Sequence, residues 1–195
     1  VRAILDSSAR AISIMRDLLY LSRKADSTSV LVSINSLISK AVEVIHYPGM
    51  SEIHQRYNFE QSLPLIYCDP VKIEQVIINV ISNAVQSILE KKKVCLESNV
   101  SFSGLLLIST QLQDEQNILI TISDNGTGIP EANRSRIFDP FFSTRPPGQG
   151  TGLGLSISHK IIEEHGGRIF FDCIDDVTVF SIVLPIERKG YNTSF

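Results

Sequence analysis

The sequence lacks the features that mark several common classes of protein. No apolar run among its 195 residues is long enough to span a bilayer, and no signal peptide is recognisable. The three cysteines, Cys68, Cys95 and Cys173, are far apart and contain no Cys-x-x-Cys spacing, which argues against a zinc site and a disulfide framework. We therefore expect reduced thiols in a cytoplasmic setting.

An excess of charge of one sign is also missing, because 18 basic and 21 acidic residues leave a net charge of only −3. The one basic run, Lys91-Lys92-Lys93, is typical of a solvated helix end, so nucleic acid is not an expected partner. The chain opens at Val1 in the middle of a helical pattern. We therefore expect a piece of a longer protein, which leaves open membrane segments elsewhere in that protein.

Residues 1–24 show the pattern of an amphipathic helix. Leu5, Ile12 and Leu19 keep heptad spacing, and further apolar residues beside them widen the stripe. A stripe this wide favours a helix in a bundle, with packing onto its own domain as the alternative. The polar residues 25–29 then read as a linker.

From residue 30 to 187 the apolar periodicity alternates between helical and strand-like. It predicts helices over 33–45, 70–89 and 151–165, and strands over 54–61, 105–112, 117–123, 168–173 and 177–184. Asp69 followed by Pro70 is a strong helix start. We expect an α+β sandwich, in which a mostly antiparallel sheet is covered on one face by three helices, followed by a tail over 188–195.

Two asparagines stand out in the predicted helix over 70–89. Asn79 and Asn83 are four residues apart, so their side chains lie on one face about one turn from each other. Asparagine is a mediocre helix former, and its amide oxygen is a suitable ligand for Mg²⁺. The alternative is that both amides are simply solvated.

The segment "ILITISDNGTGIP" combines a strand with a glycine turn. Its isoleucines alternate up to Asp124, and Gly126 and Gly128 follow. A carboxylate fixed at a strand end, beside glycines that admit a flat ring, could accept a hydrogen bond from an exocyclic amine such as that of adenine. The alternative is a plain hairpin turn, for which Asn-Gly is a strong signal.

The segment "IFDPFFSTRPPGQGTGLGLS" joins aromatic residues to a glycine-rich helix start. Phe138, Phe141 and Phe142 should dock somewhere, because exposed phenylalanine is unfavourable. Free backbone N–H groups at the helix start could hold phosphate oxygens, and Arg145 could add a bidentate cation. The glycines of this segment are Gly148, Gly150, Gly152 and Gly154. A flexible linker is the alternative.

Taken in order, these motifs resemble the ATP-binding domain of sensor histidine kinases, within the wider GHKL group of gyrase B, Hsp90 and MutL. The N box of that family resembles "NVISNA" (79–84), and the G1 box resembles "DNGTGIP" (124–130). The F box resembles "FDPFF" (138–142), and the G2 box resembles "GTGLGLS" (150–156). The resemblance covers about residues 30–187 and implies a Bergerat-type fold.

The resemblance also implies roles for individual residues. Asn83 would ligate Mg²⁺ with support from Asn79, Asp124 would bind the adenine amino group, and 138–151 would form a mobile lid over ATP. Arg145 stands where relatives often carry a lysine. The residues that the resemblance assigns to nucleotide binding are Asp124, Gly126, Gly128, Gly148, Gly150, Thr151, Gly152, Leu153 and Gly154.

The phosphoacceptor histidine of such kinases is not recognisable. Neither His46, His54, His159 nor His165 stands in the family's pattern, and His165 reads as a helix cap before Gly166-Gly167. The resemblance therefore implies an acceptor helix upstream, with residues 1–24 as the second helix of its hairpin. It further implies a homodimer through that helix, a response regulator receiver domain as partner, and placement in the cytoplasm, with a membrane-anchored sensor as one form of the whole protein.

Three other functions stay open. A GHKL ATPase that works as a conformational clamp carries a glutamate one turn before the metal-binding asparagine, where Asn79 stands here; Glu74 lies on another turn and face. A nucleotide-binding module without kinase activity would keep the boxes without transfer. A serine kinase of the anti-sigma type is disfavoured by the bundle-like helix over 1–24.

Overall fold

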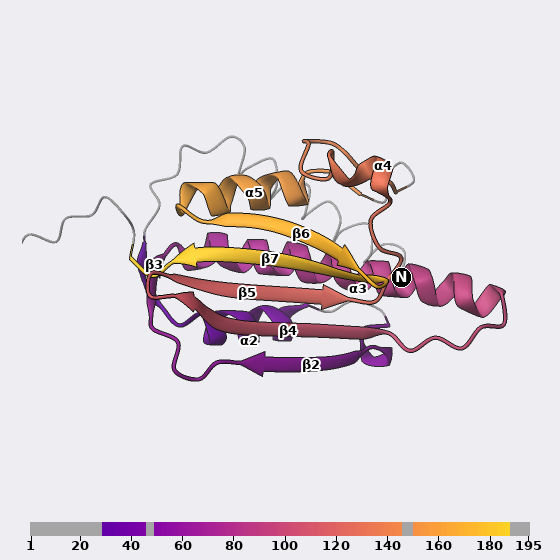
Figure 1. Ribbon diagram of the computed structural model, residues 1–195, viewed down its shortest axis with the longest axis horizontal. Coiled ribbons are helices and arrows are strands. Elements are labelled where there is room, and N and C mark those ends of the chain that lie inside the picture. The colour runs from indigo at the N-terminus through magenta and orange to yellow at the C-terminus, as the bar shows by residue number, and fades with distance from the viewer. Residues whose placement is uncertain (1–28, 46–48, 146–149, 188–195) are drawn as a thin grey trace, which may run out of the picture.

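The computed structural model describes residues 29–45, 49–145 and 150–187. The helix expected over 1–24, the homodimer expected through it, most of the linker and the tail over 188–195 lie outside the described residues, and so does Gly148. The described chain forms one α+β unit around a five-stranded sheet (Figure 1), which confirms the predicted fold class.

The central sheet has the strand order β2-β4-β5-β7-β6. Its members are β2 (His54–Phe59), β4 (Leu105–Asp114), β5 (Asn117–Asp124), β6 (Arg168–Ile174) and β7 (Val177–Pro185). β2 runs parallel to β4, whereas β4–β5, β5–β7 and β6–β7 are antiparallel. The sheet is therefore mixed and mostly antiparallel, as expected.

Three helices cover one face of this sheet: α2 (Ile34–Val44), α3 (Pro70–Glu97) and α5 (Gly154–Glu164). The strands alternate, so that Ile118, Ile120 and Ile122 of β5 are fully buried beneath the helices. The apolar face of α3 meets them with residues such as Ile77 and Ile81. This shared core fixes the distance between α3 and the sheet.

Local chemistry explains where α3 begins and ends. The Asp69 side chain accepts hydrogen bonds from the Val71 and Lys72 N–H groups at 3.1 and 3.2 Å, as the predicted N-cap should. The helix continues to Glu97, past the predicted end at residue 89. The lysine run lies in its last turns, where Lys93 is exposed and Lys92 forms an ion pair with Glu52.

Some short elements escaped the sequence analysis. β1 (Val30–Val32) and β3 (Ile66–Cys68) form a separate two-stranded antiparallel sheet, and each is too short to show alternation. The 3₁₀ helix η1 (Met50–Glu52) and the four-residue helix α4 (Glu131–Arg134) are likewise less than two turns long. The Tyr67 N–H donates to the Ile186 carbonyl oxygen at 3.4 Å, which ties β3 to the chain just after β7.

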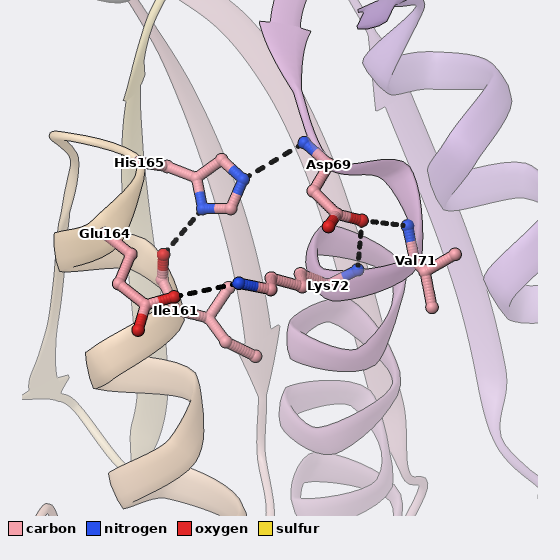
Figure 2. Close-up of polar contacts among 6 residues, drawn as sticks. All are labelled: Asp69, Val71, Lys72, Ile161, Glu164 and His165. Carbon is pink, nitrogen blue, oxygen red and sulfur yellow. Dashed lines mark hydrogen bonds and ion pairs between the residues drawn. The ribbon is translucent and has the colours of Figure 1, made fainter. Parts of the chain in front are cut away.

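Polar contacts join the first turn of α3 to the last turn of α5 (Figure 2). The His165 Nε2 accepts a hydrogen bond from the Asp69 N–H at 3.1 Å, and Nδ1 lies 2.7 Å from the Ile161 carbonyl oxygen. Because the Asp69 N–H only donates and the carbonyl only accepts, His165 is neutral with its proton on Nδ1. Lys72 and Glu164 add an ion pair at 3.0 Å. His165 is the C-cap of α5, as predicted.

No helix in the part of the chain that the structure describes combines the length and the apolar character needed to cross a membrane.

Removing the α3 cap should destabilise the protein. Asp69→Ala leaves the Val71 and Lys72 N–H groups without their side-chain acceptor, so we expect the free energy of unfolding in urea to fall by about 1 kcal/mol. Asp69→Asn keeps an acceptor oxygen and should lose much less. Equal losses in the two variants would show that the carboxylate charge, and not the cap, matters.

Candidate functional site

A cavity of about 570 Å³ opens between α3, α5 and the ends of β5 and β7. Its walls bring together segments that are distant in the sequence. Asn79 and Asn83 come from α3, Asp124 from the end of β5, and Gly152 and Gly154 from the start of α5. The structure therefore gathers three of the predicted motifs around one space.

Asp124 is held by the turn that follows it. Its side chain is 3% exposed, and its Oδ1 accepts a hydrogen bond from the Gly126 N–H at 2.9 Å. Burial raises the pKa of Asp124 to about 6, although hydrogen bonds from Gly126 and Ser87 and the positive charge of Lys91 oppose that shift. At neutral pH the site thus presents a buried carboxylate, which accepts but cannot donate a hydrogen bond.

The turn after Asp124 is not a hairpin. The Asn125 side chain accepts from the Leu105 N–H at 2.7 Å and donates to the Ser103 carbonyl oxygen at 2.9 Å, which fastens the turn to the start of β4. A Cβ on Gly126 would lie 2.5 Å from the Ser87 backbone carbon, so the close approach to α3 requires glycine there. The sequence suggested instead that this glycine makes room for a ligand.

The two asparagines of α3 are both engaged, so the alternative that they are merely solvated is wrong. The Asn79 Nδ2 donates to the Gly154 carbonyl oxygen at 3.1 Å, at the start of α5. The Asn83 Oδ1 accepts a hydrogen bond from the Arg145 guanidinium at 3.1 Å. Asn79 therefore faces α5, whereas Asn83 faces a cation within the cavity.

The residues present fit a magnesium ion that is bound together with a phosphate-bearing ligand. The Asn83 Oδ1 already receives a positively charged group, so its surroundings tolerate a cation. In residues 29–45, 49–145 and 150–187, no three His, Cys, Asp or Glu side chains gather in a metal-binding group. An ion at Asn83 would therefore need further oxygens from a bound ligand and from water.

The start of α5 carries free backbone donors. The helix begins at Gly154 without a side-chain cap, and Thr151, Gly152 and Gly154 all line the cavity. Leu153 lies behind them, because its side chain is buried and its N–H donates to the Thr151 Oγ1 at 3.2 Å. The terminus can thus meet an anion through Gly152 and Gly154 more readily than through Leu153.

The two glycines differ in whether the packing of the protein requires them. Gly152 has φ +66°, and a Cβ there would lie 2.4 Å from the Phe141 backbone carbon, so packing excludes any other residue. A Cβ on Gly154 would make only ordinary contacts, at 3.6 Å from the Asn79 Cγ. The protein alone therefore does not require a glycine at 154.

The aromatic residues of the loop divide in two. Phe138 and Phe142 pack against the core, as expected. Phe141 is 72% exposed and has φ +66°, a backbone conformation that bulky residues avoid, so its expected docking was wrong. The reason is local, because the Phe141 backbone lies against Gly152 and directs its side chain outward.

One residue of the cavity escaped the sequence analysis. Thr178 is 3% exposed, lines the cavity and stands directly opposite Asp124 in the β5–β7 register. In the sequence, Thr178 could have been noticed as a polar residue on the inward-facing side of β7, which also carries Phe180 and Ile182. Its position opposite Asp124 is evident only from the pairing of the strands.

These features together define an ATP-binding domain of the α+β class: a carboxylate at a strand end, paired amides on a helix, and an uncapped helix start around one cavity. Residues 68–188 match the family described as histidine kinase-, DNA gyrase B-, and HSP90-like ATPase, and the chain belongs to that family.

Curated relatives and solved structures show which members of this family the chain resembles. The sensor histidine kinase ZraS of Salmonella typhimurium is 31% identical over 178 residues, which are 90% of this chain and 35% of ZraS. The catalytic domain of histidine kinase ThkA superposes with a TM-score of 0.67 at 27% identity, over 82% of this chain and 98% of that domain. ThkA in complex with response regulator protein TrrA superposes with a TM-score of 0.71, over 95% of this chain and 50% of that one; at 24% identity this shows the fold alone. The chain thus spans about a third of the length of ZraS.

Asp124→Asn should stabilise the ligand-free protein at neutral pH. Burial raises the pKa of Asp124 from 3.8 to about 6, so the folded state binds this proton more tightly than the unfolded state. The carboxyl group costs nothing below the lower value, and its cost grows as the pH rises through 6, to about 3 kcal/mol at most. The gain in the free energy of unfolding over wild type should therefore increase between about pH 4 and about pH 7.

Asp114→Asn is the matched control. Hydrogen bonds from Asn117 and Gln116 lower the pKa of this exposed carboxyl group, so the wild type gains stability from it as the pH rises over the acid range. The free energy of unfolding of Asp114→Asn should therefore fall increasingly below that of the wild type over the same range. A gain for Asp124→Asn that shrinks with rising pH would contradict the assignment of a buried, destabilised carboxylate.

Proposed function

We propose that this chain is the ATP-binding catalytic part of a sensor histidine kinase, which transfers the γ-phosphoryl group of Mg·ATP to a histidine on another helix of the full protein. The observation that carries this proposal is the convergence of Asp124, Asn83 and the uncapped start of α5 on one cavity. The likeness to sensor histidine kinases supports it.

Each wall of the cavity suits one part of ATP. The Asp124 carboxylate accepts a hydrogen bond from the adenine amino group, and the Thr178 hydroxyl opposite it can bind a second edge atom of the base. Asn83 holds Mg²⁺, which neutralises phosphate charge when bound. The N–H groups of Gly152 and Gly154 and the Arg145 guanidinium receive the phosphate oxygens.

The position of the carboxylates favours transfer over hydrolysis. Asp124 and Glu90 line the cavity, and both lie toward the end proposed for adenine. Glu90 is seven residues beyond Asn83, which is about 10 Å along the helix, and residue 79 is an amide. A clamp-type ATPase needs a base that activates water beside the metal. The described part of the cavity offers no carboxylate there.

The partners follow from this proposal. The phosphoryl group passes first to the histidine helix, in a homodimer built through residues 1–24, and then to a response regulator receiver domain. The existence of a solved complex of ThkA with a response regulator supports that last step. For a reaction that uses ATP and a receiver domain, we propose the cytoplasm as the location.

The decisive experiment uses the full-length protein with γ-labelled ATP. We expect protein-bound label that acid removes, as phosphohistidine chemistry requires. Asn83→Ala should abolish the Mg²⁺-dependent label, because it removes the amide oxygen proposed to hold the ion. Lys93→Ala, an exposed change on the same helix, should leave it intact. Rapid phosphate release without any acid-labile label would instead establish a clamp-type ATPase. Protein-bound label that is stable in acid would establish a serine kinase.

Gly154→Ala should affect the stability of the protein and its affinity for Mg·ATP in opposite directions. Because a Cβ there meets only ordinary contacts, the free energy of unfolding of the variant in urea should rise by about 0.5–1 kcal/mol. Its affinity for Mg·ATP in calorimetry should fall about tenfold, because the methyl group stands where phosphate approaches. Gly126→Ala, which clashes with the Ser87 backbone, should be destabilised instead. Unchanged affinity of Gly154→Ala would remove the phosphate role of this helix start.

A further inference from the structure

A buried hydroxyl group lies at the junction of the two helices that form the cavity. Ser158 is one turn into α5, and its side chain is 0% exposed. Its Oγ donates to the Gly154 carbonyl oxygen at 2.8 Å. The Asn79 Nδ2 lies 3.3 Å from the same Oγ and 3.1 Å from the same carbonyl oxygen. These contacts form a triangle between α3 and the first turn of α5.

The chemistry of these groups fixes the orientation of the Asn79 amide. The Gly154 carbonyl oxygen only accepts hydrogen bonds, and the Ser158 hydroxyl group donates its hydrogen bond to that carbonyl. Both partners therefore present lone pairs to Asn79, and only its Nδ2 can face them. The Asn79 Oδ1 consequently takes part in neither of these two contacts. In the flipped orientation it would face two acceptor oxygens.

This triangle links the two polar ends of the cavity. Asn79 lies one helical turn before Asn83, the residue proposed to hold Mg²⁺. Gly154 is the first residue of α5, whose free N–H groups are proposed to receive phosphate. A change at Ser158 therefore alters both the amide orientation of Asn79 and the seating of the helix start, although Ser158 does not itself line the cavity.

We propose that Ser158 is a positioning residue which, through Asn79, holds the metal-binding face of α3 in register with the phosphate-binding start of α5. This inference rests on the proposed function. It separates the roles of the two asparagines, because Asn79 serves through its N–H donors and Asn83 through its oxygen.

The test compares the affinity for the ATP analogue AMPPNP with Mg²⁺ and with EDTA, by calorimetry. We expect Ser158→Ala to reduce the Mg²⁺ enhancement of affinity about fivefold, the value of one hydrogen bond, with little change in EDTA. Ser156→Ala is the matched control: its Oγ donates to the carbonyl oxygen of Leu153, the N-cap residue of the same helix, and within the described part of the chain it makes no hydrogen bond with Asn79. It should keep the wild-type enhancement.

Asn79→Asp gives the sharper result. If residue 79 served as a metal ligand, the added negative charge would strengthen the Mg²⁺ enhancement. If it serves through its N–H donors, the carboxylate repels Gly154 and Ser158 oxygens, and the enhancement falls. The double variant Asn79→Asp/Ser158→Ala should then be no worse than Asn79→Asp alone, because both changes break the same triangle.

The outcomes distinguish the two proposals. A wild-type enhancement that survives in Ser158→Ala, or rises in Asn79→Asp, overturns the positioning role and leaves the proposed function standing. Failure of the wild-type protein to bind AMPPNP under either condition overturns both. Far-ultraviolet circular dichroism and the urea midpoint establish that each variant is folded.

Discussion

The antiparallel contact between α3 and α5 is the constraint on which the cavity depends. It is fastened by the His165–Asp69 and Lys72–Glu164 contacts at the end of α5, and by the contact between Asn79 and Gly154 at its start. The apolar faces of both helices belong to one core over the sheet. Because α3 carries the amide oxygen and α5 the free N–H groups, their relative position determines how far apart the proposed magnesium and phosphate sites lie.

Asp124 shows that the same site is organised at the expense of stability. A carboxylate buried between strands is disfavoured by its loss of hydration, and the bond from Gly126 offsets that loss only in part. Phe141 adds a second disfavoured feature, an exposed aromatic ring on a left-handed backbone. Both lie at or beside the cavity, whereas the sheet and helices that support it follow ordinary packing.

The sequence was sufficient for the features that depend on local order. The helices, the alternating strands and the Asp69 cap follow from periodicity and from short-range hydrogen bonding. The order of the four boxes then pointed to the cavity. The roles of Gly126 and Thr178 could not be foreseen, because they depend on a helix approaching a turn and on a strand register. The same holds for Asn79, whose partner is 75 residues away.

The pairing of β1 with β3, and of Tyr67 with Ile186, brings both ends of the described domain to one edge of the molecule. β5 runs away from that edge (Figure 1), and Asp124 is its last residue. The cavity, which Asp124 lines, thus lies at the end of the sheet opposite this edge. Any rotation about this edge would therefore displace the cavity further than the edge itself, without a change in the residues that line the cavity.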